Sequence, residues 1–288
     1  MNKTLLKQVL TYLGIVALFL VLAYGFVPQV LAGKVVNQSD ISAWQGMTHE
    51  ILQHNKANPD DPTLWTNSMF GGMPVVTMYD KFDGDWTNPI YKLLMLGKRP
   101  ATYLFVALLG AFLLMLSMGV GKVLSIAGAI AVAFCSYNLQ IIQVGHNTKM
   151  QAIAFFPWVL AGLIFTYRKA LETPSDERKL PSWLSLSALG SVLFALALSM
   201  QIKANHPQIT WYLACCVVLY ALVVFISIMA KKEGRAEAFK RFMCASSLLL
   251  VVGCIGIATN ANKLLPTQRY AKHTMRGGSE LKAETNDK

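Results

Sequence analysis

Seven long apolar segments constrain the fold of this chain more than any other feature of its sequence. A helix needs roughly 20 mostly apolar residues to cross the hydrocarbon core of a bilayer. Apart from Lys122 at the edge of one segment, none of the seven contains a Lys, Arg, Asp or Glu. The segments are residues 9–31, 101–118, 121–138, 150–167, 183–200, 208–229 and 243–261. We therefore predict an all-α, polytopic integral membrane protein with about seven transmembrane helices. Ion-coupled transport is disfavoured, because ion pathways usually carry charge inside the membrane.

The composition indicates one membrane domain over residues 1–288. The chain is 54% hydrophobic and only 14% charged, which is too apolar for an ordinary soluble domain. A net charge of +11 could indicate nucleic-acid binding, but the basic residues form short clusters between the apolar segments, so we predict no nucleic-acid partner. The five cysteines lie inside the apolar segments, and no loop therefore carries a pair for a disulfide or a zinc site.

The basic clusters predict the orientation in the membrane, because short cytoplasmic loops are enriched in Lys and Arg. The residues assigned to the cytoplasm are Lys3, Lys7, Lys122, Arg168, Lys169, Arg178, Lys179, Lys231, Lys232, Arg235, Lys240 and Arg241. The N-terminus is then cytoplasmic, and the C-terminus lies outside after seven crossings. The polar motifs that fall outside are residues 39–40, 145–149, 203–208 and 260–278. We expect any chemistry at that outer face.

The first outer loop, residues 32–100, is too long to be a plain connection. Apolar residues recur at helical spacing from Ile41 to Leu52, which predicts an amphipathic helix over 41–56 lying on the membrane or on the bundle. Residues 65–74 are apolar and rich in glycine and are expected to fold back over the bundle. The loop also contains Asp80, Asp83 and Asp85. These carboxylates could bind a divalent metal, although they lack EF-hand spacing and a solvated turn is the commoner interpretation.

Asp40 stands at the start of the predicted amphipathic helix and has two interpretations. Asp is a favoured N-cap, because its carboxylate accepts a bond from a free backbone N–H and interacts well with the helix dipole. A carboxylate at the membrane surface can also orient and polarise an acceptor hydroxyl in a reaction. The sequence leaves both interpretations open.

Three further motifs combine basic and polar residues at the outer face. His146 and Lys149 stand three residues apart before the fourth apolar segment, where they are either an interfacial pair reaching toward water or ligands of a phosphate. Asn205 and His206 precede Pro207, and a helix start capped by Asn205 explains the motif except for His206. Metal binding by the two histidines is only weakly supported by their spacing. The C-terminal tail, residues 262–288, adds basic residues that are either solvated or part of a cationic ring around an anionic headgroup; they include Lys263, Arg269 and Arg276.

Several of these motifs together resemble the YfhO family of bacterial membrane proteins, which are similar to the C-type (GT-C) glycosyltransferases. The matching segments are residues 36–40 with Gln45, residues 65–74, 145–149 and 205–208, and residues 274–281. The resemblance covers nearly the whole chain. The family members are longer, with more transmembrane helices, so the chain is expected to be a truncated relative or the N-terminal part of one.

The resemblance implies an enzyme of the bacterial cytoplasmic membrane that transfers a sugar from a polyprenyl-phosphate carrier to a cell-envelope polymer or lipid on the outer face. By position, Asp40 would activate the acceptor. His146, Lys149, His206 and Arg276 would bind the carrier phosphate, with Asn205 and Arg269 beside them. No cofactor is implied, and a single acidic residue at position 40 leaves the dependence on a divalent metal open.

Two other classes of function remain compatible with the sequence. A transporter or flippase for a lipid carrier would need a central polar cavity, which apolar segments with so little charge disfavour. A non-catalytic membrane scaffold would not need Asp40 to lie near Lys149, His206 and Arg276. The position of Asp40 relative to the basic residues is therefore the structural feature that separates an enzyme from a scaffold.

Overall fold

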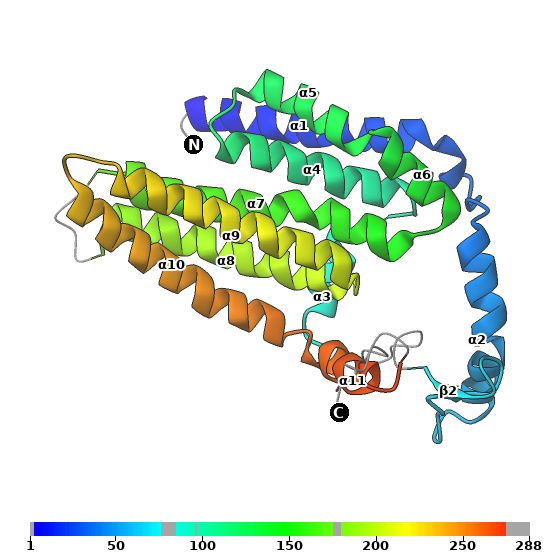
Figure 1. The fold of residues 1–288 in the computed structure, drawn as a ribbon. Helices are drawn as coiled ribbons and strands as arrows, with labels where there is room; N and C mark the ends of the chain where they lie inside the picture. Colours follow the sequence, from blue (N-terminus) through cyan, green and yellow to red (C-terminus); the bar gives the residue numbers. More distant parts are fainter. Residues whose placement is uncertain (1–2, 76–84, 96, 175–179, 275–288) are drawn as a thin grey trace, which may run out of the picture. The chain divides into compact units, whose positions relative to one another are not determined.

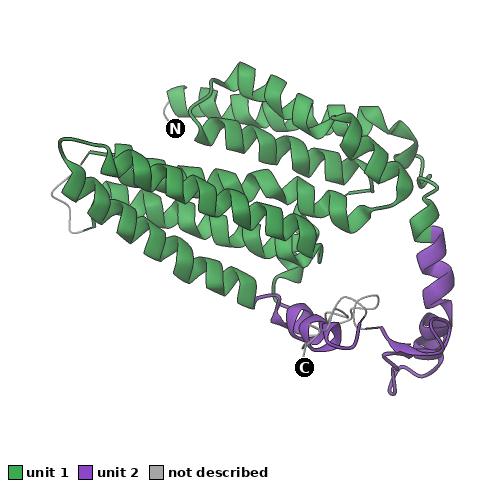
Figure 2. Ribbon diagram, viewed as in Figure 1, with its two compact units in different colours: residues 1–41, 86–258 green, residues 42–85, 259–288 purple. Residues whose placement is uncertain are grey.

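A computed structural model describes residues 3–75, 85–95, 97–174 and 180–274, and these residues form an almost entirely α-helical protein (Figure 1). The chain divides into two compact units (Figure 2). Unit 1 comprises residues 1–41 and 86–258, and unit 2 comprises residues 42–85 and 259–288. The predicted outer loop, residues 32–100, is thus divided between the two units.

Unit 1 is a bundle of long apolar helices, as the sequence predicts. Its elements are α1 (Lys3–Phe26), η1 (Pro28–Val30), α3 (Asn88–Leu94), α4 (Ala101–Ser117), α5 (Lys122–Ala133), α6 (Ser136–Val144), α7 (Asn147–Glu172), α8 (Ser182–Lys203), α9 (Pro207–Met229) and α10 (Arg235–Ala258). Among the residues that the structure describes, six helical stretches, one of them α5 and α6 together, are long and apolar enough to cross a membrane. The remaining predicted segment is α4, whose 17 residues reach the lower limit for a membrane-spanning helix. A multi-pass membrane protein is therefore confirmed.

Helix α7 is the centre of this bundle, with α4 and α8 packed along it. A Cβ atom on Gly162 would lie 2.7 Å from the backbone of Phe194, so α7 and α8 approach each other as closely as a glycine permits. Small residues at helix contacts are typical of membrane proteins, where packing rather than water exclusion holds helices together. Trp158 of α7 reaches the other neighbour and donates a hydrogen bond from Nε1 to the carbonyl of Val106 in α4, at 2.9 Å.

One transmembrane stretch is interrupted between α5 and α6. Phe134 and Cys135 leave the helical conformation, and the side chain of Asn138 fills the break. Its Nδ2 donates to the carbonyls of Val132, at 2.9 Å, and Ala133, at 3.3 Å. The side chain thereby satisfies backbone groups that the helix no longer pairs.

Side-chain contacts identify the two ends of the unit 1 bundle. At one end, Arg168 donates to the carbonyl of Ser117, Arg241 donates to that of Thr173, and Lys122 lies over the ring of Tyr12. These three cations belong to the loops assigned to the cytoplasm. The opposite end, here called the Asp40 end, carries the start of α2 together with the α6–α7 and α8–α9 turns. The sequence correctly sorted these groups by end of the bundle.

Unit 2 contains most of α2 (Ser39–Ala57), a hairpin of β1 (Trp65–Thr66) and β2 (Met73–Pro74), and α11 (Ala261–Ala271). Helix α2 corresponds to the amphipathic helix predicted over 41–56. In the predicted glycine-rich piece 65–74 the two strands pair antiparallel, with Trp65 opposite Pro74. The sequence-based expectation gave no strand there. The indole of Trp65 lies against Gly72, where a Cβ atom would come within 2.7 Å of it.

Candidate functional site

The Asp40 carboxylate contacts His146 at the Asp40 end of unit 1. Asp40 Oδ2 lies 2.9 Å from His146 Nδ1, and both side chains are about half exposed, at 45% and 49%. A carboxylate can only accept a hydrogen bond, so Nδ1 carries the proton and donates it to Asp40. The second imidazole nitrogen, Nε2, is then the basic atom of a neutral His146. This arrangement, a carboxylate that orients an imidazole, is how general bases are built in many enzymes.

Asp40 is not the residue that precedes the helix, as the N-cap interpretation requires. Helix α2 begins at Ser39, so Asp40 lies in its first turn. An acidic side chain there still interacts favourably with the helix dipole. Its side chain contacts His146, more than a hundred residues away in the sequence, so helix capping does not account for its position.

Polar contacts hold the start of α2 against the α6–α7 turn. Gln38 and Asn147 exchange two side-chain hydrogen bonds, with Asn147 Nδ2 donating to Gln38 Oε1 at 3.0 Å and Gln38 Nε2 donating back at 3.3 Å. Gln38 also donates to the carbonyl of Ile142, and Ser39 donates to that of Val144 at 3.3 Å. These contacts flank the Asp40–His146 pair and fix the two chain segments that carry it.

Gly145 makes the approach of the two segments possible. It ends α6 in the left-handed region with φ +109°, where glycine pays no steric penalty. A Cβ atom on this residue would lie 3.1 Å from Cβ of Gln38 and 3.2 Å from Cβ of Asp40. Glycine at position 145 therefore favours both the turn and the contact.

Lys149 and His206 lie near this pair and correspond to predicted phosphate ligands. Lys149 stands one helical turn after His146, and its Nζ lies 5.1 Å from the ring centroid of Tyr137. Burial lowers the pKa of His206 below its ordinary value of 6.5, and the positive charges of Lys149 and His146 lower that pKa further. His206, Lys149 and His146 therefore lie close enough to interact electrostatically.

His206, and not Asn205, caps α9. Its Nδ1 accepts a hydrogen bond from the backbone N–H of Ile209 at 3.4 Å, and Pro207 occupies the first helical turn. Asn205 instead adopts φ +54°, a left-handed conformation that asparagine tolerates better than most residues. Because Nδ1 accepts, the proton of neutral His206 sits on Nε2. Nε2–H is a donor that remains for a ligand.

A second polar cluster lies at the Asp40 end of unit 1. Of its residues, the sequence analysis had singled out only Lys203. Tyr91 of α3 donates from its hydroxyl to Gln151 Oε1 of α7 at 2.9 Å. Lys203 of α8 donates from Nζ to Thr87 Oγ1 at 3.0 Å and lies 5.7 Å from the Tyr91 ring centroid. Lys203 and Gln151 are each only 7% exposed. The available signal was Gln151, a polar residue inside the apolar segment 150–167.

Unit 2 has a pocket of about 530 Å³ that is lined mainly by polar side chains. Glu50 and His54 of α2, one turn apart, contribute to its wall together with Asp61, Trp65 and Asn67. Ser68 donates a hydrogen bond to Glu50. The sequence gave these residues no role, because the hairpin that brings them together was not predicted.

The remaining predicted site residues belong to unit 2 or lie outside the described residues. Arg269 is in the last turn of α11 in unit 2. Arg276, Asp80 and Asp83 lie outside the described residues. Within the described residues, no group of three or more His, Cys, Asp and Glu side chains is arranged to hold a metal ion. The metal site considered for the aspartates of the outer loop thus stays a prediction.

Comparison of the chain with protein-family models, with curated proteins and with solved structures gives no match. The assignment of a function therefore depends on the geometry at the Asp40 end of unit 1 and on the resemblance stated above.

Proposed function

We propose that this protein is a glycosyltransferase of the bacterial cytoplasmic membrane that transfers a sugar from a polyprenyl-phosphate carrier to a cell-envelope acceptor. The observation that supports it most is the 2.9 Å contact between Asp40 and His146, an oriented imidazole open to water at one end of a membrane-spanning bundle. In this proposal the N-terminus is cytoplasmic and the Asp40 end faces outward, as the distribution of basic residues predicts.

His146 and Asp40 have different roles in the proposed reaction. His146 Nε2 accepts the proton of the acceptor hydroxyl while the hydroxyl oxygen forms a bond to the anomeric carbon of the sugar. The bond from that carbon to the carrier phosphate breaks, and its electron pair leaves with the phosphate. Asp40 positions the imidazole and stabilises the imidazolium that forms. The sequence-based prediction made Asp40 the direct activator of the acceptor; the contact geometry favours a positioning role.

Lys149 and His206 supply what the departing phosphate needs. Lys149 contributes a positive charge one turn from His146, and neutral His206 contributes the Nε2–H donor. Donors and charges fixed in advance toward a developing anion lower the barrier to its departure. Asn205, Arg269 and Arg276 are retained as further predicted ligands by their place in the sequence.

The test is sugar transfer by the full chain reconstituted in lipid nanodiscs. Polyprenyl phosphates carrying different radiolabelled sugars would be supplied with a bacterial cell-envelope extract, and label in envelope polymer and lipid would be counted. We expect transfer with at least one sugar, and a loss of about 10²- to 10⁴-fold in His146→Gln, the usual contribution of a general base. His49→Gln, which changes an exposed histidine of α2 with no assigned role, is the matched control.

A direct role for Asp40 predicts a different pattern in the same assay. If Asp40 itself accepts the proton, Asp40→Asn abolishes transfer while His146→Gln retains most of it. If His146 accepts the proton, both variants lose transfer and Asp40→Asn changes the pH profile. No transfer from any sugar tested, or full transfer by both variants, overturns the proposal.

A further inference from the structure

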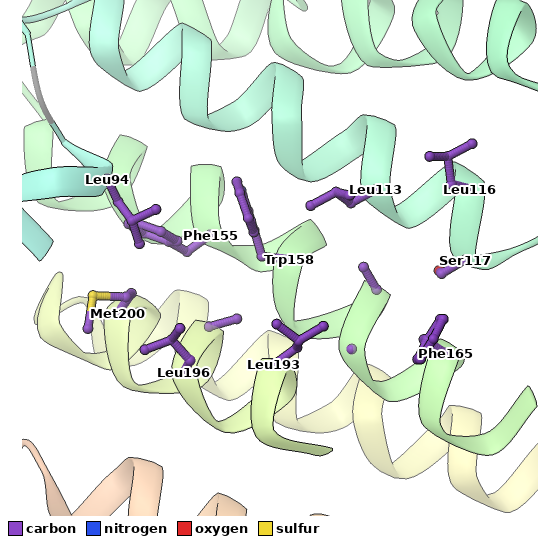
Figure 3. A pocket seen from close by; sticks show the side chains of 13 residues that line it. Leu94, Leu113, Leu116, Ser117, Phe155, Trp158, Phe165, Leu193, Leu196 and Met200 are labelled. Atoms are coloured by element: carbon purple, nitrogen blue, oxygen red, sulfur yellow. The ribbon is translucent and has the colours of Figure 1, made fainter. Parts of the chain in front are cut away.

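Helices α4 and α8 both pack along α7, and an apolar groove of about 350 Å³ lies between them (Figure 3). Its floor is α7, and its walls are side chains of α4 and α8. The lining residues are Leu94, Leu113, Leu116, Ser117, Phe155, Trp158, Ala161, Gly162, Phe165, Leu193, Leu196, Ala197 and Met200. Its volume is within the range of small-molecule sites.

The groove is open to the side of the bundle. Leu113 on one wall and Leu193 on the other are 37% and 49% exposed, although both line the groove. In a helix bundle that crosses a membrane, such exposed apolar walls face the hydrocarbon of the bilayer. The groove therefore opens toward lipid chains and not toward water.

On α3, α7 and α8, the row of residues that lines the groove, here called the lining stripe, continues along the helix to Tyr91, Gln151 and Lys203 of the buried polar cluster. On α8 the groove residues Leu193, Leu196 and Met200 recur at helical spacing, and the next residue of that stripe is Lys203. On α7 the stripe that includes Phe155 leads back by one turn to Gln151. On α3, Tyr91 stands one turn before Leu94. These three stripes end in residues that contact one another: Tyr91 with Gln151, and Lys203 with the Tyr91 ring.

We infer that this groove binds one chain of an anionic bilayer phospholipid, with the lipid phosphate at the end marked by Lys203. A phospholipid places its phosphate at the membrane interface and its chain in the hydrocarbon, which is the order of polar cluster and apolar groove found here. Lys203 supplies the complementary positive charge in surroundings that screen it weakly. The site uses residues other than Asp40 and His146, and lipid binding there does not depend on sugar transfer.

Native mass spectrometry of the purified full chain tests this inference. The protein would be exchanged from detergent into mixtures of phosphatidylglycerol and phosphatidylcholine, and retained lipid would be counted per chain. We expect one retained phosphatidylglycerol and a preference of about fivefold over phosphatidylcholine, the contribution typical of one cation near anionic lipid. Lys203→Gln should remove the preference, and Lys203→Arg should keep it.

Variants that fill the groove test lipid binding without changing Lys203 or the other residues of the polar cluster. Leu193→Trp and Leu113→Trp should reduce the retained lipid, because indoles at the two walls narrow the opening. Val192→Trp, on the same helix and exposed but outside the groove, should retain lipid like the wild type, and all variants should elute as the same species in gel filtration.

Three results would overturn the inference. Equal retention of the two lipids by the wild type removes the role of Lys203. Unchanged retention in both tryptophan variants removes the groove. Displacement of phosphatidylglycerol by an added isoprenyl phosphate at equal concentration shows that the groove belongs to a carrier lipid. Lipid retention and sugar transfer are separate measurements, so either proposal can fail alone.

Discussion

Two polar clusters at the same end of unit 1 differ in their access to water. The Asp40–His146 pair is about half exposed, whereas Gln151 and Lys203 of the second cluster are almost fully buried. An exposed contact of a carboxylate with an imidazole adds at most roughly 0–1 kcal/mol to stability, as exposed ion pairs do, while a buried polar group that loses its partner costs about 1–3 kcal/mol. Changes to the first cluster should therefore affect stability little, and changes to the second should cost more.

The largest expected effect tests whether Asp40 and His146 act as one unit in transfer. Asp40→Ala and His146→Ala should each lower transfer by about 10²-fold or more, and the double variant should be little worse than either alone, because parts of one catalytic unit are not additive. Additive losses would mean that the two residues act independently. The melting temperatures of all three variants should stay near that of the wild type, because the exposed Asp40–His146 pair contributes little to stability.

The next effect concerns the turn that brings the exposed pair together. Gly145→Ala should reduce both stability and transfer, because the new Cβ meets Gln38 and Asp40. Gly33→Ala is the matched control: it has a positive φ of +79° but nothing within 4 Å of the added atom. The control should cost about 1–2 kcal/mol of conformational strain, and Gly145→Ala roughly a further 1–3 kcal/mol from crowding. Equal melting temperatures of the two variants would contradict the contact.

A smaller effect is expected in the buried cluster. Tyr91→Phe removes the hydroxyl that donates to Gln151 and should destabilise the protein by about 1–3 kcal/mol, measured by thermal unfolding in detergent. Tyr137→Phe, whose side chain is 46% exposed, should leave the melting temperature nearly unchanged. If Tyr91→Phe is equally harmless, the hydrogen bond is not part of what stabilises this end of the bundle.

The smallest effect is a pH dependence that arises from His206. Burial and two neighbouring positive charges hold its pKa below 6.5 in the folded protein. As pH falls below 6.5, the unfolded chain binds a proton before the folded one does, so stability present above that pH is lost progressively. His206→Asn keeps a capping side chain but cannot titrate. Its stability should fall less between pH 7 and pH 5 than that of the wild type, and parallel losses would exclude His206 as the cause.

The sequence predicted the helices well because membrane helices are defined by local composition. Each of the seven apolar segments corresponds to described helical structure, and the amphipathic periodicity from Ile41 to Leu52 corresponds to α2. The β1–β2 hairpin was missed because each strand has only two residues, too few for a side-chain pattern. The hairpin is defined by backbone pairing alone. Capping was assigned to Asn205 on general preference, whereas the local backbone conformation gives that role to His206.

The candidate site was predicted as a list of residues but not as an arrangement. Orientation placed Asp40, His146 and Lys149 at one end of the bundle, yet no local pattern shows that Asp40 contacts His146 or that Gln38 pairs with Asn147, because these contacts join segments about a hundred residues apart. Gly145 was the one local clue, as a glycine directly before His146 permits a close approach. Gln151 was a signal for the second cluster, as a polar residue inside an apolar segment, but nothing in the sequence showed that its partner is Tyr91.

Asn138 and the break between α5 and α6 depend on each other during insertion into the membrane. An asparagine amide in hydrocarbon is costly unless it is hydrogen-bonded, and so are carbonyls released from a helix. Here the Asn138 amide donates to the carbonyls of Val132 and Ala133. The hydrogen bonds therefore remove the cost of the buried amide and the cost of the released carbonyls together. Replacing Asn138 by leucine would raise the hydrophobicity of the segment and still hinder its partitioning, unless the two helices fused into one. The break between α5 and α6 is thus encoded by Asn138, the polar side chain that lowers the hydropathy of this segment.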